Sequence, residues 1–166
     1  MRDHMKCAAM NEHESYMRRA IALAVENVRS GNGGPFAAII VKDGKVVAEG
    51  VNSVTRLSDP TAHAEVMAIR SACAKLGTFQ LDGCTLYTSC EPCPMCLGAI
   101  YWARPSAIYY GGTHKDAAAA GFDDSFIYQQ TRMKAEERAI PMQQILHEES
   151  RASFEEWMHS ATKIPY

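Results

Sequence analysis

The segment SCEPCPMC at residues 89–96 contains three of the six cysteines of this 166-residue chain, and the segment HAE at residues 63–65 precedes it. A catalytic zinc ion takes three protein ligands, commonly histidine and cysteine, and keeps one position open for water. His63, Cys93 and Cys96 supply such a set. Because the two cysteines are three residues apart, they would be neighbours on one helix face within reach of a single metal. The sequence therefore predicts a catalytic zinc site with these three ligands.

Two residues beside this ligand set have different predicted roles. Cys90 has the Cys-x-x-Cys spacing with Cys93, so a closed structural site with four protein ligands and no water stays an alternative. Because Cys90 precedes Pro92 at the end of a predicted strand, we favour a loop or core thiol. Glu65 is better suited to proton transfer than to metal binding, because zinc held by two thiolates acidifies water only weakly and a neighbouring base must help.

The composition is that of an ordinary globular protein, with 47% hydrophobic and 22% charged residues. The length suits one domain with a core of its own. A net charge of −2, and a C-terminal part (residues 112–166) with six Lys/Arg against nine Asp/Glu, predict no nucleic-acid partner. We also expect no membrane association and no secretory signal, because no apolar run approaches the roughly 20 residues that span a bilayer. A cytoplasmic location is expected, where thiols stay reduced.

Strand-like and helix-like patterns alternate along the chain after an opening hairpin. Strands are predicted over residues 36–42, 45–51, 84–88, 106–110 and 142–146. Helices are predicted over residues 15–29, from about 59–61 to 76, and over 93–103, 116–120, 124–129 and 150–162. Residues 1–11 lack periodicity and are expected to form a loose N-terminal extension. This order predicts an α/β protein with a mixed five-stranded sheet and helices on both faces.

Longer segments around the cysteines resemble a known family. The H-x-E and P-C-x-x-C pair is typical of zinc deaminases of the cytidine deaminase superfamily. Further stretches resemble its small bacterial guanine deaminases: GGPF at 33–36, DPTAHAEV at 59–66, AIRSAC at 68–73, YTSCEPCPMCLGAIYWARP at 87–105, GFDDSFIY at 121–128, and the terminal Tyr166. The resemblance covers about residues 12–166 as a single cytidine/deoxycytidylate-deaminase-type domain. Ala37 departs from it, because glycine is expected after GGPF.

The resemblance implies a three-layer α/β/α fold and the hydrolysis of guanine to xanthine and ammonia. Zinc-bound water would attack C2 of the ring, and Glu65 would carry its proton to the ring nitrogen and then to the leaving amine. Asp124 would face the amino group as a second proton carrier. The open alternative for Asp124, as for Asp123, is a cap on the helix that follows.

The resemblance also implies the substrate contacts and the assembly. Asn52 would hydrogen-bond the purine, Phe36 would stack on it, and Ala64 would contact it. The chain would form a homodimer that exchanges its C-terminal segment, about residues 150–166, so that Tyr166 covers the partner's site. The alternatives stay open that Asn52 merely ends a strand, that Phe36 is a core residue, and that Tyr166 acts in its own subunit or not at all.

Other functions remain possible at this stage. Guanosine deaminase uses the same motifs, and the sequence does not decide whether the pocket has room for ribose. A tRNA adenosine deaminase and a cytidine deaminase are more distant alternatives, the former disfavoured by the acidic C-terminal part. A non-catalytic structural zinc module would bind zinc through four protein ligands and release no ammonia.

Overall fold

The computed structural model describes the backbone of residues 2–166 and the side chains of residues 11–166. The chain divides into two compact units, Met1–Asp124 and Ser125–Tyr166, each described by itself. The first unit contains α1 (Arg2–Arg29), β1 (Ala37–Lys42), β2 (Lys45–Val51), α2 (Val54–Leu57), α3 (Ala64–Leu76), β3 (Cys84–Cys90), α4 (Pro94–Ala103), β4 (Ala107–Gly112) and α5 (His114–Ala119).

The first unit is built around a mixed sheet with the strand order β2-β1-β3-β4. β1 pairs antiparallel with both β2 and β3, whereas β3 pairs in parallel with β4. Asp43 and Gly44 join the first two strands with positive φ angles of 49° and 70°. Two successive positive φ values match the twist of a tight hairpin, as the Asp-Gly pair predicts.

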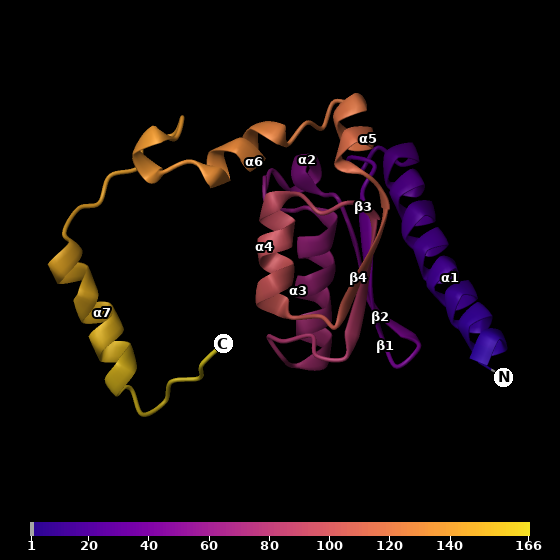
Figure 1. The fold of residues 1–166 in the computed structure, drawn as a ribbon, viewed down its shortest axis with the longest axis horizontal. Helices are drawn as coiled ribbons and strands as arrows, with labels where there is room; N and C mark the ends of the chain where they lie inside the picture. Colours follow the sequence, from indigo (N-terminus) through magenta and orange to yellow (C-terminus); the bar gives the residue numbers. More distant parts are fainter. Residues whose placement is uncertain (1) are drawn as a thin grey trace. The chain divides into compact units, whose positions relative to one another are not determined.

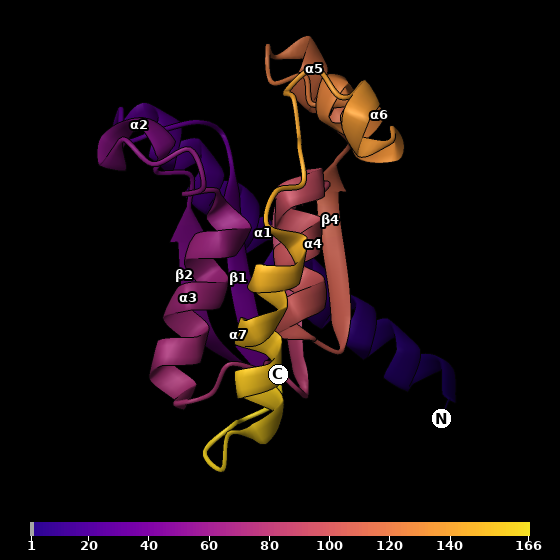
Figure 2. The ribbon, with the colours of Figure 1, turned by 90° about the vertical axis from the view of Figure 1, so that its left-hand side faces the viewer.

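The sheet forms the middle of three layers, with α1 against one face and α3 and α4 side by side against the other (Figures 1 and 2). Successive side chains of a strand point to opposite faces. Accordingly, Ala38 and Ile40 of β1 join the core under α3 and α4. Ile39 and Val41 instead join Tyr87 and the apolar side chains of α1. Both faces of the sheet are therefore covered, as the three-layer prediction requires.

Helix α3 lies unusually close to β2. A Cβ atom at Gly50 would lie 2.3 Å from the Ala64 carbonyl oxygen and 2.4 Å from the Ala68 backbone nitrogen. Only glycine permits this approach. The contact brings the first turn of α3, with His63 before it and Glu65 within it, directly against the sheet.

The second unit contains α6 (Ser125–Arg132), a short 3-10 helix η1 (Ala135–Glu137) and α7 (His147–His159). The predicted fifth strand, residues 142–146, is wrong: this segment has no strand conformation, and the sheet has four strands. A strand is stable only when its backbone pairs with a neighbour, and the second unit contains no other strand. Its apolar residues Met142, Ile145 and Leu146 are exposed instead.

Two predicted helix starts are also wrong. α1 begins at Arg2 instead of near Ser15, so residues 2–11, for which the sequence predicts a loose extension, continue the helix. α3 begins at Ala64, because Asp59 closes a turn by accepting hydrogen bonds from the Thr61 backbone N–H and hydroxyl. Every helix in the described part of the chain is too short or too polar to cross a lipid bilayer.

Candidate active site

The predicted metal ligands lie at the N-terminal ends of two neighbouring helices. His63 is the residue immediately before α3, and Cys93 is the residue immediately before α4, each with an extended backbone. Pro94 occupies the first turn of α4, where its missing N–H costs nothing. Cys96 lies within the same turn. Both helices therefore direct their positive N-terminal ends toward one site, which favours a thiolate over a thiol there.

The three predicted ligands come together. One nitrogen of His63 and the sulfur atoms of Cys93 and Cys96 all lie within 4.8 Å of one another. The Cys93 Sγ atom is 3.6 Å from His63 Nδ1. One imidazole and two thiols form a donor set that suits zinc, whose bonds to nitrogen and sulfur are about 2.0–2.3 Å long. These residues are positioned to hold one metal ion, as the sequence predicts.

The two thiols of this set have opposite pKa shifts. A hydrogen bond from the Cys96 thiol, assisted by His63, lowers the pKa of Cys93 to about 4. The same bond, together with burial, raises the pKa of Cys96. In this hydrogen bond Cys96 supplies the proton. Since zinc binds thiolates, metal binding must displace this proton.

Glu65 lies beside the metal ligands as a buried carboxyl group. It is 6% exposed, and the Thr88 hydroxyl of β3 donates a hydrogen bond to its Oε1 atom over 3.3 Å. Burial raises the pKa of Glu65 above its ordinary value. A buried carboxyl group with a raised pKa takes up a proton more readily than an exposed one, which suits the predicted acid/base role of Glu65. Thr88 was missed by the sequence analysis, although it lies in the quoted segment 87–105.

Cys90 is directed away from the metal ligands. Its Sγ atom donates to the Thr113 carbonyl oxygen over 3.5 Å, and burial raises its pKa, so it is a thiol. Within the described residues, the group able to hold a metal contains Cys93 and Cys96 but not Cys90. The open three-ligand site, rather than the closed four-ligand alternative, fits this geometry.

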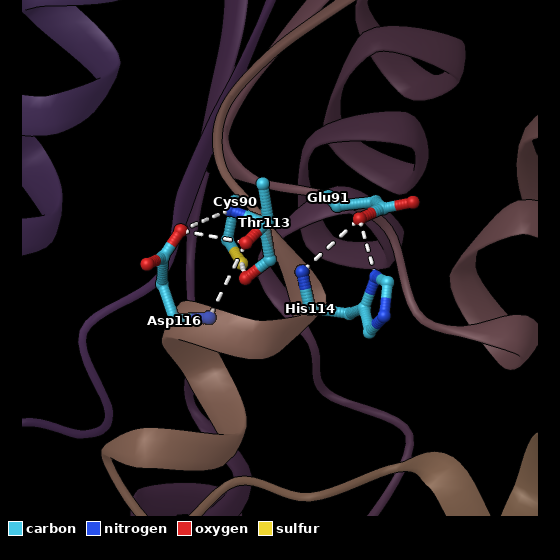
Figure 3. A network of polar contacts seen from close by, with 5 residues as sticks. All are labelled: Cys90, Glu91, Thr113, His114 and Asp116. Atoms are coloured by element: carbon cyan, nitrogen blue, oxygen red, sulfur yellow. Dashed lines mark hydrogen bonds and ion pairs between the residues drawn. The ribbon is translucent and has the colours of Figure 1, made fainter.

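Cys90 belongs to a polar network that joins the segment before α4 to the start of α5 (Figure 3). Glu91 Oε2 accepts from the His114 backbone N–H over 3.0 Å and contacts His114 Nδ1 at 2.8 Å. Thr113 and Asp116 form a reciprocal cap at the first turn of α5. The network fixes α5, and thus the start of the segment that leads to Asp124, beside the metal-ligand loop.

Two predicted substrate residues lie on neighbouring backbone segments. Asn52, which is buried, follows β2, and its backbone N–H donates to the Phe36 carbonyl oxygen over 2.9 Å. The Asn52 Oδ1 atom accepts from the Gly34 N–H over 3.4 Å. The Phe36 ring packs edge-to-face against Phe122 with 4.9 Å between ring centroids. Phe122 is a residue that the sequence analysis missed, although it lies within the quoted GFDDSFIY.

The remaining predicted site residues differ in their surroundings. Asp124 is half-buried, and burial raises its pKa, with the nearby Cys93 acting in the same direction. Ala64 is fully buried in the first turn of α3. Tyr166 ends the second unit, and its contact with substrate stays a prediction. In the first unit, Cys93 therefore lies near both Glu65 and Asp124.

Comparison with known proteins identifies the class. Residues 10–112 match the cytidine and deoxycytidylate deaminase zinc-binding region. The chain belongs to this family of zinc-dependent deaminases, and its α/β fold is the cytidine deaminase-like fold. A guanine deaminase from Bacillus subtilis (strain 168) is 60% identical over 154 residues, which are 93% of this chain and 99% of that protein. The X-ray structure of guanine deaminase from Bacillus subtilis has a TM-score of 0.91, with 93% of this chain and 98% of that chain covered.

Less similar relatives include a second guanine deaminase and a tRNA-specific adenosine deaminase. A structure of guanine deaminase from Nitrosomonas europaea is 37% identical, with a TM-score of 0.64, and covers 67% of this chain and 64% of that one. A tRNA-specific adenosine deaminase from Aquifex aeolicus (strain VF5) is 46% identical over 81 residues, 49% of this chain and 54% of that protein. The latter similarity spans about half of each chain, whereas the Bacillus subtilis similarity extends through both units.

Proposed function

We propose that this protein hydrolyses guanine to xanthine and ammonia. The observation that carries the proposal is the open set of His63, Cys93 and Cys96 with the buried carboxyl group of Glu65 beside it. The 60% identity to a guanine deaminase over 93% of the chain selects guanine among the substrates of the family. A zinc ion held by these three ligands would act as a Lewis acid that lowers the pKa of water.

Glu65 moves the protons of the reaction. It accepts a proton from the attacking water and passes it to the ring nitrogen adjacent to C2, while the oxygen bonds to C2. The remaining proton of that water, now on the oxygen bonded to C2, is transferred to the amino group. The C2–N bond then breaks, ammonia leaves, and the oxygen remains on C2 as a carbonyl. The raised pKa of Glu65 supports this role, because burial makes its carboxylate a better proton acceptor. Its bond from Thr88 holds one carboxyl oxygen in place.

Four further residues complete the proposed pocket: Asp124, Asn52, Phe36 and Ala64. Asp124 faces the leaving amine as a second proton carrier, which its raised pKa supports. Because Asn52 Oδ1 accepts from Gly34, we assign its amide NH2 group to an acceptor atom of the purine. The Phe36 ring offers a face for the base, and Ala64 provides a small wall at the first turn of α3.

The protein acts as a homodimer in this proposal, with Tyr166 of each chain covering the partner's pocket. The support is the apolar surface of the second unit, where Phe154, Trp157 and Met158 of α7 are all exposed. Apolar side chains gathered in this way are typical of a surface that a partner covers. The free thiols of the described cysteines suit a reducing compartment such as the cytoplasm.

A panel of possible substrates tests the proposed activity. Ammonia release is measured with guanine, guanosine, adenine, cytosine and cytidine, and guanine should give the highest kcat/KM. A higher kcat/KM for guanosine than for guanine would show that the nucleoside is the preferred substrate. Zinc-loaded protein that releases no ammonia from any compound would contradict the deaminase assignment.

Mixed dimers test the role of Tyr166. A Glu65→Ala chain is co-expressed with a chain that lacks Tyr166, and dimers carrying one copy of each are purified through two different tags. If Tyr166 acts in the partner, one site of the mixed dimer has both Glu65 and Tyr166, so activity should exceed that of either parent dimer. Absence of recovery, or a monomer in solution, would refute the exchanged arrangement.

A further inference from the structure

Asn27 is a buried polar residue in the last part of α1, with an exposed fraction of 4%. Its Nδ2 atom donates to two backbone carbonyl oxygens, those of Gly34 and Asn52, each over 2.9 Å. A side-chain amide NH2 group has two hydrogens to donate, so both are used. Neither acceptor belongs to α1, and the two acceptors lie 18 residues apart in the chain.

The two acceptors belong to the backbone segments that carry the proposed purine contacts. Gly34 lies two residues before Phe36, and the Phe36 N–H donates back to the Gly34 carbonyl oxygen over 2.8 Å. Asn52 is bonded to the Phe36 carbonyl oxygen through its own N–H and accepts from Gly34 through its side chain. Asn27 therefore joins both segments through one amide group.

The loop that contains these residues is closely packed at Gly33. A Cβ atom at Gly33 would lie 2.2 Å from the Asn52 carbonyl oxygen and 3.1 Å from Asn27 Nδ2. Contacts this short are not tolerated between a side chain and backbone. The bonds from Asn27 thus act on a closely packed junction, where a small displacement of one segment is transmitted to the other.

The position of α1 on the sheet depends on other residues. Tyr16, Met17 and Leu23 pack against the apolar cluster of Ile39, Val41 and Tyr87. Ala20 and Ala24 are buried along the same helix. The contribution of Asn27 is therefore local to the junction of the two segments, and the metal ligands are on other elements.

We infer that Asn27 is a positioning residue for the substrate: it holds Phe36 and Asn52 in the relative arrangement that binds the purine. This inference rests on the proposed function, because it assumes that those two side chains contact the base. The inference predicts a specific kinetic effect. Loss of the two bonds should weaken substrate binding, while zinc binding and proton transfer, which depend on His63, Glu65 and the cysteines, continue.

The test is Asn27→Asp, which keeps the shape of the side chain and replaces the NH2 donor by an acceptor. KM for guanine should rise at least tenfold, with kcat changed less than about threefold and the zinc content unchanged. Asn32→Asp is the matched control, because Asn32 is an exposed residue of the same loop region and undergoes the same chemical change. It should leave KM within about twofold of the wild-type value.

A second variant disturbs the same junction through the residue that packs against Asn52. Gly33→Ala introduces the Cβ atom that must displace Asn52, and it should raise KM in the same way without altering Asn27. Guanine binding to both variants is also measured by calorimetry in the Glu65→Gln background, where turnover is expected to be slow.

The outcomes separate this inference from the proposed function. If the wild-type protein deaminates a different compound of the panel, KM is measured for that compound, and the same rise is expected. Either folded variant with full zinc content and wild-type KM would overturn the positioning role. A fall in kcat with unchanged KM would also overturn it, as would failure of both variants to fold, since Asn27 would then serve stability alone.

Discussion

The Thr88 hydroxyl of β3 donates a hydrogen bond to the Glu65 carboxyl group of α3 across the interface between sheet and helix. Both side chains are buried, with exposed fractions of 1% and 6%. Buried polar groups are costly unless they are hydrogen-bonded, so each side chain limits the orientation of the other. Glu65 is thereby held next to Cys93 and Cys96 in one orientation.

Replacing Thr88 by valine, a residue of similar shape, should lower kcat for guanine about three- to tenfold. Glu65 keeps its carboxyl group but loses the bond that orients it, so proton transfer becomes less frequent. Zinc content, measured by metal analysis, should stay the same. Thr85→Val on the same strand is the matched control and should leave kcat unchanged. Equal kinetic effects of the two variants would remove Thr88 from a role in catalysis.

Glu65→Gln should retain the fold and the zinc but lose most of the turnover. Glutamine has a similar shape and cannot accept and return a proton, and a positioned acid/base contributes roughly 10²- to 10⁴-fold to a rate. Because Glu65 would serve both transfers of the proposed mechanism, we expect the upper end of this range. The measurement is ammonia release at saturating guanine, and residual activity above about a tenth of wild type would contradict the mechanism.

Alanine substitution of the three clustered cysteines should divide them into two groups. Cys93→Ala and Cys96→Ala should each lose nearly all zinc and all activity, because each removes one of three protein ligands. Cys90→Ala should keep both, since its thiol bonds to the Thr113 carbonyl oxygen instead. Metal analysis of the purified proteins decides the matter. If Cys90→Ala loses metal and activity together, the four-ligand site is the correct one.

Asp124→Ala should lower turnover on guanine at least tenfold, and Asp123→Ala should have only a mild effect. Asp124 is half-buried with a raised pKa near Cys93, whereas Asp123 is exposed. Each variant is compared with wild type for kcat and for Tm. A lowered Tm with equal, mild kinetic effects would indicate that both carboxylates act as helix caps rather than in catalysis.

The raised pKa of Tyr87 predicts that the protein becomes less stable at alkaline pH. Burial is the main cause that raises its pKa to about 12, compared with about 10 in an unfolded chain. The unfolded state therefore releases this proton first, and the free energy of unfolding decreases as the pH rises from about 10 to about 12. In urea titrations at several pH values, Tyr87→Phe should show a smaller decrease than wild type. Tyr110→Phe, a change at an exposed position of β4, should behave like wild type.

Local sequence patterns were sufficient for most of the first unit. Conformational preferences of the residues themselves explain the Asp43-Gly44 turn and the strands on either side of it. They also explain why α3 ends at Gly77. The metal ligands could also be predicted, because two of them share one helix turn and their chemistry is specific. These features depend on residues that are close together in the chain.

Features that join distant segments required the tertiary structure. Thr88 bonds to Glu65 only because β3 and α3 belong to adjacent layers, and Asn27 joins two loops that no local pattern connects. Residues 142–146 were predicted to form a strand, but a strand needs a paired neighbour, and a local sequence pattern cannot supply one. The sequence by itself therefore determined which residues can bind zinc, and it led to the prediction of which residues transfer protons. The packing of helices on the sheet decided how those residues are oriented, because that depends on hydrogen bonds between segments far apart in the chain.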